Sequence, residues 1–247
     1  MLILYYTVMN GRFKERSLQG ELLDSPEVPA QLLVRNLREL DFLNRRSGGH
    51  HVSLEGIKML MTNREKPYHI VDLGCGSGDL LRYIADWAFK HRIKVKLTGV
   101  DVKPAAIGYL QEKSAGYPEI SAVTADYKTY LDKNPAIDIL VCSLFCHHLD
   151  DTELLRLLNR INLQSAAGFV INDLQRTPMA YYAAAAMTTV LGGSSLSRHD
   201  GPVSVLRGFK KEELQVLFQK AGVKHYLIRR RPFFRLLAVG GNNFQGS

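Results

Sequence analysis

The sequence predicts an α/β protein built on a seven-stranded, mostly parallel sheet, and three observations support this. Short apolar runs alternate with amphipathic helical patterns over residues 69–240. A glycine-rich turn at residues 74–78 joins the first apolar run to the helix after it. The last two runs are separated only by residues 230–233, too short for the crossover that parallel neighbours need. The sheet is therefore expected to end in an antiparallel hairpin.

The predicted strands are short runs rich in aliphatic residues. They cover residues 69–73, 95–100, 120–124, 137–144, 167–172, 224–229 and 234–239. The run at 137–144 is apolar almost throughout, as expected of a central strand that helices cover on both faces.

Four helices are expected between these strands, each from apolar residues spaced three or four positions apart. They cover residues 79–91, 104–113, 151–161 and 210–221. Pro104 suits the first turn of its helix. Gly222 is placed to end the last of the four.

Two further helical patterns precede the first strand. One runs from Pro29 to Asn44, and the other begins with Ser53 as its N-cap. Because both lie ahead of the sheet, residues 1–62 are expected to form an N-terminal segment and helical cap. Residues 63–247 then form the main domain.

Residues 178–208 do not fit the alternation of strands and helices. The stretch is rich in Ala, Gly and Ser and carries Tyr181 and Tyr182. Segments inserted above the carboxyl ends of parallel strands commonly build substrate pockets. We expect a lid here that closes over the substrate and moves more than the sheet, since Gly192 and Gly193 permit backbone motion.

The composition is that of an ordinary globular protein, with 46% apolar and 23% charged residues. The three cysteines lack the spacing of a disulfide framework or a metal site, which favours a reducing, cytoplasmic location. No apolar run is long enough to span a bilayer. We expect a monomer or a homodimer.

The N-terminal run from Leu2 to Val8 is apolar, but no basic residue precedes it and no cleavage site follows it. It therefore does not match a signal peptide. Met9 is an alternative start, because polar, domain-like sequence begins directly after it.

The formal net charge is +8, and part of the excess lies near the C-terminus. The basic cluster there consists of Lys224, Arg229, Arg230, Arg231 and Arg235. Such a cluster can bind nucleic acid or an anionic substrate. We favour a solvated strand face, because the nearby aromatics Tyr226, Phe233 and Phe234 alternate as core-facing strand residues do. Nucleic acid is therefore not the expected partner.

The strongest local signal is the run from Ile70 to Gly78, IVDLGCGSG. Its glycines let a ligand approach the backbone closely. The GxGxG spacing differs from the GxGxxG of dinucleotide-binding loops, and the acidic Asp72 would repel a pyrophosphate. A phosphate-binding loop of the Walker type is excluded, because no Lys-Ser/Thr follows Gly78. A ligand with a cationic group near the loop fits better.

The run VDLGCGSG at residues 71–78 resembles the first motif of the class I methyltransferases that depend on S-adenosylmethionine (SAM). The second motif of that family is an acid that ends the next strand, as Asp101 does, and a further acid follows the third strand, as Asp126 does. The paired histidines in residues 146–149 are common in several branches that act on small molecules. The resemblance covers residues 69–240 and implies a Rossmann-like fold with SAM as the cofactor.

The resemblance also implies individual roles. Asp72 helps to place the amino group of SAM, and the loop glycines lie under its methionine and ribose parts. Asp101 accepts hydrogen bonds from both ribose hydroxyls. Asp126 accepts one from the adenine amino group, with Tyr127 beside the ring. The predicted cofactor-binding residues are Asp72, Gly74, Gly76, Gly78, Asp101, Val102, Asp126, Tyr127 and Ser143.

The segment after the fourth strand excludes several acceptor classes. It reads Ser-Leu-Phe-Cys at residues 143–146, where the amino-methyltransferases of DNA adenine and protein glutamine carry Asn/Asp-Pro-Pro-Tyr. No proline precedes Cys142 or Cys146, whereas the pyrimidine C5 enzymes use a Pro-Cys nucleophile. Both cysteines are expected to pack as small apolar residues.

A metal-dependent enzyme of the catechol type would need a carboxylate cluster, and we expect no metal. Asp150, Asp151, Asn172 and Asp173 are the candidates. An N-cap role for Asp150 or Asp151 is the simpler explanation. The remaining pattern resembles enzymes of the ubiquinone/menaquinone type and those acting on phenolic or polyketide-like products. This implies a small aromatic or apolar acceptor and, first of all, O-methylation, with carbon and nitrogen left open.

Methyl transfer to a hydroxyl needs the acceptor aligned and its proton removed. Histidine suits the second task near neutral pH. His199, next to Asp200, and His148 are the candidate catalytic residues, and His147 is a weaker candidate. Arg198 and Arg207 are candidates to hold an anionic acceptor. An RNA-directed methyltransferase and a non-catalytic SAM-binding protein remain as alternatives.

Overall fold

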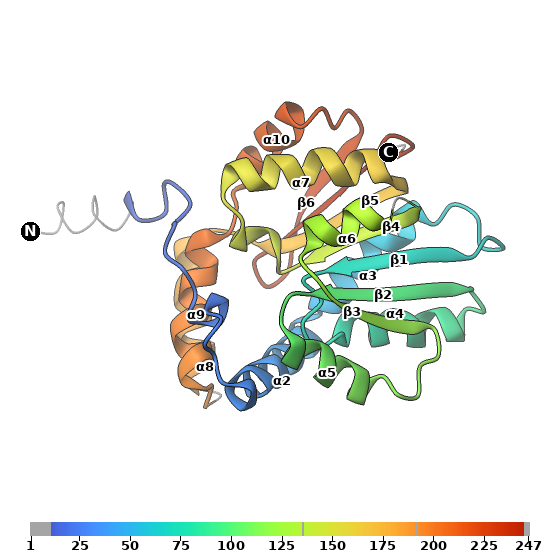
Figure 1. Ribbon diagram of the computed structural model, residues 1–247. Coiled ribbons are helices and arrows are strands. Elements are labelled where there is room, and N and C mark those ends of the chain that lie inside the picture. Colours follow the sequence, from blue (N-terminus) through green and yellow to red (C-terminus); the bar gives the residue numbers. More distant parts are fainter. Residues whose placement is uncertain (1–10, 135, 191, 245–247) are drawn as a thin grey trace, which may run out of the picture.

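The computed structural model describes residues 11–134, 136–190 and 192–244 (Figure 1). The interpretations of Leu2 to Val8 and of Met9 concern residues outside these ranges. No helix in the described part of the chain is both long enough and apolar enough to cross a membrane.

The sheet has seven strands in the order β3-β2-β1-β4-β5-β7-β6. The strands are β1 (Tyr68–Leu73), β2 (Val95–Asp101), β3 (Ile120–Thr124), β4 (Ile137–Ser143), β5 (Ser165–Leu174), β6 (Tyr226–Arg231) and β7 (Arg235–Gly240). The first five are parallel, while β7 runs antiparallel to both β5 and β6. The predicted mostly parallel sheet with an antiparallel C-terminal hairpin is confirmed.

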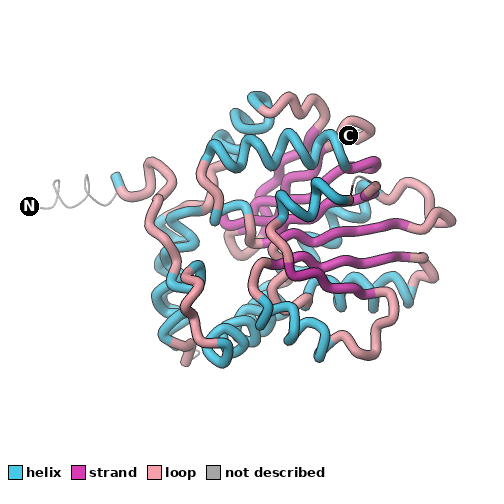
Figure 2. The backbone as a smooth tube through the Cα atoms, viewed as in Figure 1, coloured by secondary structure: helices cyan, strands magenta, loops and turns pink. Residues whose placement is uncertain are grey.

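Helices cover both faces of the sheet, which lies between them in Figure 2. The helices are α2 (Ala30–Ser47), α3 (Gly49–Leu60), α4 (Asp79–Lys90), α5 (Pro104–Lys113), α6 (Tyr127–Lys133), α7 (Asp151–Gln164), α8 (Pro178–Val190), α9 (Ser195–Arg207) and α10 (Lys211–Lys220), with the short 3₁₀ turns η1 (Leu22–Asp24) and η2 (Cys146–His148). Side chains of α6, α7 and α10 pack on one face, and those of α3, α4 and α5 pack on the other. Alternate strand residues supply the two cores: Val71 faces the first and Ile70 the second.

The two N-terminal helices differ in position. α2 contacts α5 and α9 and lines the cavity described below, as a cap would. α3 instead packs flat on the sheet, where Ile57 is fully buried, and a Cβ on Gly56 would lie 2.7 Å from a methyl carbon of Val170. The expectation that both helices lie apart from the sheet is therefore wrong for α3. The N-cap at Ser53 is also wrong: the helix begins at Gly49, directly after Gly48 in the left-handed conformation.

Three other local features go beyond the predictions or differ from them. The helix α6 was not expected, and Asp126 caps it by accepting a hydrogen bond from the Lys128 amide. The insertion at 178–208 consists of two helices, α8 and α9. Phe233 and Phe234 do not face the core of the sheet. They form the β6–β7 turn in the left-handed conformation, and Phe233 is 60% exposed.

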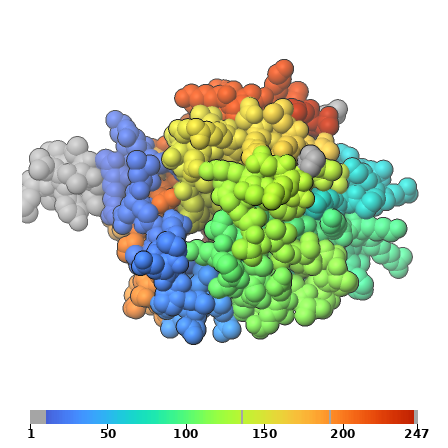
Figure 3. Space-filling model, in the orientation of Figure 1, coloured from blue at the N-terminus to red at the C-terminus, as the bar shows by residue number. Residues whose placement is uncertain are grey.

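Buried arginines fasten the N-terminal segment, residues 11–25, to the C-terminal half. Arg176 is 1% exposed and donates to the carbonyls of Phe13 and Lys14 at 3.3 Å each. Arg16 reaches back to the Leu149 carbonyl at 2.8 Å. The segment (blue) thus lies beside α8 and α9 (orange) in the space-filling view (Figure 3). It covers the end of the molecule where the parallel strands have their carboxyl ends.

Because α3 is part of the core, we expect Ile57→Ala to lower the free energy of unfolding by about 2–5 kcal/mol, the range for a buried aliphatic side chain cut to alanine. Urea denaturation followed by circular dichroism measures this. His51→Ala, on the exposed side of the same helix, is the matched control and should change the stability by less than about 0.5 kcal/mol. Equal effects of the two substitutions would contradict the assignment of α3 to the core.

Candidate active site

A cavity of about 530 Å³ lies over the carboxyl ends of β1, β2 and β4. The glycine loop and the segments after β2, β3 and β4 form its floor, while α2, α8 and the N-terminal segment form its walls. Of the predicted cofactor-binding residues, those that line it are Gly74, Gly76, Asp101, Val102, Asp126, Tyr127 and Ser143. The strands therefore bring most of the predicted set to one place.

The glycine loop needs its glycines for backbone conformation and for space. Gly74, Gly76 and Gly78 all have positive φ, between 51° and 71°. A Cβ on Gly74 would lie 2.3 Å from the Phe145 ring, so a side chain there would clash with that ring. Asp101 fixes the loop: one carboxylate oxygen accepts from the Gly76 amide at 3.0 Å and the other from the Lys103 amide at 2.9 Å. The glycine loop and Asp101 are thus fixed to each other, and both line the cavity, where a ligand can contact them.

The aromatic side of the cavity lies after β3. Tyr127 is buried, and its hydroxyl has no hydrogen-bond partner among the described residues. Burial and the neighbouring acids, first Glu153 and then Asp126, raise its pKa, so the hydroxyl keeps its proton. Its ring meets that of Phe145 edge to face at 5.6 Å. This corner suits a flat ring with a polar edge.

Two predicted residues lie beneath the cavity rather than in its lining. Asp72 is 2% exposed, and burial together with the charges of Asp79 and Asp101 raises its pKa well above the usual range. One of its oxygens has no hydrogen-bond partner among the described residues. Gly78 acts as the N-cap of α4. The acids that face the cavity here are Asp79 and Asp101, so the part of Asp72 in placing the amino group stays a prediction.

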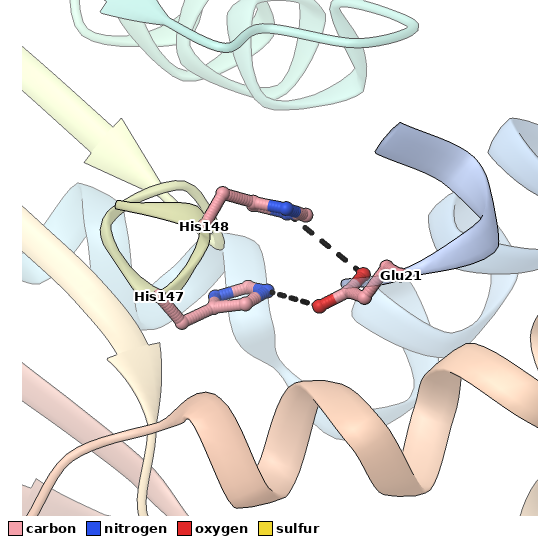
Figure 4. A group of neighbouring side chains, drawn as sticks. All are labelled: Glu21, His147 and His148. Carbon is pink, nitrogen blue, oxygen red and sulfur yellow. Dashed lines mark ion pairs between the residues drawn. The ribbon is translucent and has the colours of Figure 1, made fainter. Parts of the chain in front are cut away.

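The paired histidines at the end of β4 meet Glu21 of the N-terminal segment (Figure 4). The His147 Nε2 lies 3.4 Å from Glu21 Oε1, and the His148 Nε2 lies 4.0 Å from Glu21 Oε2. The Nδ1 atoms face other carboxylates: His147 faces Asp173 at 2.7 Å and His148 faces Asp24 at 2.8 Å. Each imidazole thus lies between two carboxylates.

The two histidines differ in burial. The His147 side chain is 3% exposed; burial opposes its charge, but Asp173 and Glu21 outweigh this and raise its pKa to about 10. His147 is therefore protonated at neutral pH and cannot accept a further proton. The His148 side chain is 22% exposed and lines the cavity. His148, not His147, therefore presents the more accessible ring to a bound molecule.

The predicted anion-binding arginines have other contacts. Arg207 donates to the carbonyls of His147, His148 and Gln19 at 3.0, 2.7 and 2.8 Å. It holds the histidine turn against the N-terminal segment rather than facing a ligand. Arg198 is exposed and is not among the described residues that line the cavity.

His199 is displaced from the site as well. Its Nδ1 faces Asp200 at 2.7 Å, as the sequence suggested, but His199 is absent from the described lining of the cavity. The Asp200 carboxylate is instead used by the backbone, since it accepts from the amides of Leu22 and Leu23. The hypothesis of a base at His199 therefore loses its geometric support.

The acids and amides of the predicted metal cluster separate. Asp150 caps α7 by accepting from the Glu153 amide, while Asp151 is exposed and pairs with Arg16. Asn172 donates to Gly49 and Ser53, and Asp173 holds His147.

Sequence reasoning missed three polar groups of the cavity wall. Glu21 and Asp24 lie in a segment without strand or helix periodicity, and only their spacing as the two acids of a capping box marks them. Arg235 was assigned to an exposed cluster, but it is 6% exposed, donates to Asn44 at 2.6 Å and lines the cavity. Burial lowers its pKa to about 10.

The remaining lining is largely apolar. α2 contributes Leu33, Leu37 and Leu40, and α8 contributes Ala180 and Met187. Leu37 reaches the glycine loop, since a Cβ on Gly76 would lie 3.1 Å from one of its methyl carbons. A small apolar or aromatic molecule can fill this part of the cavity without leaving polar groups unpaired.

Comparisons with known proteins agree with this geometry. Residues 70–163 match the family model described as a methyltransferase domain. The curated proteins give no match.

Solved structures share the fold at low identity. The plantazolicin methyltransferase BpumL, in complex with SAH, aligns with a TM-score of 0.63 at 15% identity, over 86% of this chain and 94% of that chain. A SAM-dependent methyltransferase from Aquifex aeolicus gives a TM-score of 0.53 at 16% identity, over 88% and 94% of the two chains. The CurJ carbon methyltransferase aligns with a TM-score of 0.57 at 14% identity, over 78% of this chain and 53% of that chain.

The family match includes the glycine loop and Asp101, which line the cavity. The solved structures share the fold that forms this cavity. Residues 70–163 are therefore similar to a methyltransferase domain, and the chain has the fold of the solved methyltransferases named above.

Proposed function

We propose that this chain is a SAM-dependent methyltransferase that acts on a small, apolar or aromatic acceptor and transfers the methyl group to an oxygen atom. The observation that carries the proposal is the composition of one cavity. Apolar side chains of α2 and α8 line it together with the polar cluster of Glu21, His147 and His148, and we assign the acceptor to this part of the cavity. A flat acceptor there would direct a hydroxyl toward that cluster.

We assign the cofactor to the other part of the cavity. Asp101 would hold the ribose hydroxyls, the glycine loop would lie against the ribose and methionine, and Tyr127 and Asp126 would flank the adenine. The glycine loop in the lining and the Tyr127 hydroxyl, which has no hydrogen-bond partner among the described residues, support this assignment. When bound, SAM supplies a methyl group that its positively charged sulfur has already activated.

The tasks left to the protein are alignment and removal of the acceptor's proton. The apolar walls align a ring and exclude water. Of the two predicted catalytic residues, we keep His148, which lines the cavity, and we no longer assign a role in the reaction to His199. We also propose that α8 and α9, the insertion at 178–208, act as the lid through which the acceptor enters.

The same observations favour a small molecule over RNA. The basic cluster near the C-terminus does not form one patch: Arg231 pairs with Glu55, Arg230 lies 3.9 Å from Glu212, and Arg235 is buried. Phosphate binding needs clustered free cations and would weaken steeply with salt. A purely regulatory SAM-binding protein would not need the polar cluster in an apolar pocket.

The function itself is tested by supplying SAM and a panel of simple phenols and catechols and measuring SAH and methylated product by mass spectrometry. We expect product with the methyl group on oxygen. SAH formation only with RNA, or only with carbon or nitrogen acceptors, would contradict the proposal.

For the cofactor assignment, we expect Asp101→Ala to weaken SAH binding by about 1.5–3 kcal/mol, the range for hydrogen bonds to a charged group. This is a rise of roughly 10-fold to 150-fold in dissociation constant, measured by calorimetry. Asp132→Ala removes an exposed acid that pairs with Arg160 and should leave affinity unchanged. Unchanged affinity in a folded Asp101→Ala protein would exclude the assignment.

For the acceptor side, we expect His148→Ala to lower turnover by about 10²–10⁴-fold, as when a group that assists proton removal is lost. SAH affinity should stay close to that of the unchanged protein, because the glycine loop is untouched. His199→Ala removes another carboxylate-paired histidine and should retain full turnover. A loss with His199→Ala but not with His148→Ala would reverse the two assignments.

A further inference from the structure

Glu21, His147 and His148 lie close together, but the distances between them are too long for strong hydrogen bonds. Their potential ligand atoms, one from each residue, lie within 4.8 Å of one another. The two closest approaches, 3.4 Å and 4.0 Å, are longer than a charge-assisted hydrogen bond of about 2.7–2.9 Å. Three strong ligands therefore converge without closing on one another (Figure 4).

We propose that this cluster is a binding site for a divalent transition-metal cation, held by Glu21 and the Nε2 atoms of His147 and His148. Two imidazoles and one carboxylate are a ligand set typical of zinc and of similar metals. Ligands about 2.0–2.2 Å from one tetrahedral ion lie roughly 3.3–3.5 Å apart. The separation between His147 and Glu21 already matches this, and the half-buried His148 needs only a small adjustment.

The surroundings of the three residues support a metal more than a simple ion pair. A histidine that ligates a metal through one nitrogen almost always donates the other N–H to a carboxylate or carbonyl. His147 does so here, toward Asp173, while the His148 Nδ1 lies 2.8 Å from Asp24 as an ion pair without hydrogen-bond geometry. Both Nε2 atoms are thereby turned toward Glu21, the orientation that ligation needs.

The backbone that carries the ligands is also fixed in advance. Arg207 holds the carbonyls of His147 and His148. Asp200 accepts from the two amides that follow Glu21 in the chain. The geometry of a metal site is usually set by such surrounding contacts, because the ligands alone do not hold their own orientation.

The local charge is suited to a dication. The acids in direct contact with the cluster are Glu21, Asp24 and Asp173. Of the nearby guanidinium groups, Arg207 lies 4.0 Å from Glu21 and 3.7 Å from Asp24, while Arg16 donates to the His147 carbonyl but is paired with Asp151. Without a metal, the proton on His147 offsets part of the negative charge; a dication on Nε2 would displace that proton and, with Arg207, balance the three carboxylates.

This inference rests on the proposed function for its chemical role. The acceptor's hydroxyl oxygen would complete the coordination, and its proton would pass to water because the cation lowers the pKa of the hydroxyl. A lone pair on that oxygen then forms the bond to the methyl carbon, the carbon–sulfur bond breaks, and its electron pair stays on sulfur to give SAH. His148 then assists proton removal through the cation that it ligates and does not accept the proton itself.

The site is tested first by binding alone, without SAM or acceptor. The purified full chain is freed of metal by a chelator, checked by elemental analysis, and titrated with Zn²⁺ by calorimetry and with Co²⁺ by visible absorption. We expect one equivalent to bind, and Co²⁺ to give the absorption of a tetrahedral site. Asp24→Asn should weaken binding by about 10–100-fold, the usual effect of losing a group that orients a ligand.

Glu21→Gln and His148→Asn, which remove ligands with little change in shape, should weaken binding further than Asp24→Asn. His199→Ala is the matched control and should bind like the unchanged chain. His50→Asn separates this cluster from Asp41, His50 and Asp79, the other group with ligand spacing, and should also leave binding intact. Absence of binding, or binding that Glu21→Gln and His148→Asn do not change, would overturn the site.

Measuring turnover distinguishes failure of the metal site from failure of the proposed methyl transfer. The metal-free chain should regain methyl transfer to a phenol when Zn²⁺ or Co²⁺ is added back. Full turnover in protein shown to be metal-free would overturn the inference and leave the proposed function intact. One bound equivalent without transfer to any oxygen acceptor would uphold the metal site and contradict the proposed function.

Discussion

His147 lies between two buried carboxylates that come from distant parts of the chain, Asp173 at the end of β5 and Glu21 in the N-terminal segment. Charges so deeply buried are stable only when paired, because each alone would lose its hydration without replacement. The pairing therefore ties the N-terminal segment to the carboxyl edge of the sheet. Removing one partner of such a group typically costs about 3–5 kcal/mol, since the other charge stays buried.

Several other contacts depend on this arrangement. The turn η2 can present His148 to the cavity only while Arg207 holds its carbonyls, and Arg207 also holds Gln19. The cap and the reaction site are thus not separate features. The segment that closes the cavity also supplies a polar group to its lining, which links closure of the pocket to completion of the site.

At the other end of the cavity, the proposed cofactor site is formed largely by backbone. Asp101 ends β2 and holds the Gly76 amide, so the loop after β1 and the end of β2 are fixed to each other. The sheet order places β1 between β2 and β4, which brings the glycine loop, Asp101 and the histidine turn to one edge. This is where parallel α/β sheets bind ligands, because the loops after adjacent strands converge there.

What the sequence determined by itself was local. The alternation of apolar runs, the glycine loop and the short link before β7 predicted the sheet and its hairpin, because periodicity and loop length act over a few neighbouring residues. The same local signals placed Asp101 and Asp126 at strand ends. They did not distinguish α3 from a cap helix, since an amphipathic helix shows which face it buries but not against what.

Only the tertiary structure decided which distant groups meet. Asp200 follows His199 directly, and this adjacency suggested a catalytic pair, but His199 is absent from the described lining of the cavity and Asp200 also accepts from the amides of η1. Glu21 and Asp24 have no sequence pattern that links them to His147 and His148. Their convergence follows from the packing of the N-terminal segment on α9, a long-range contact that no local periodicity encodes.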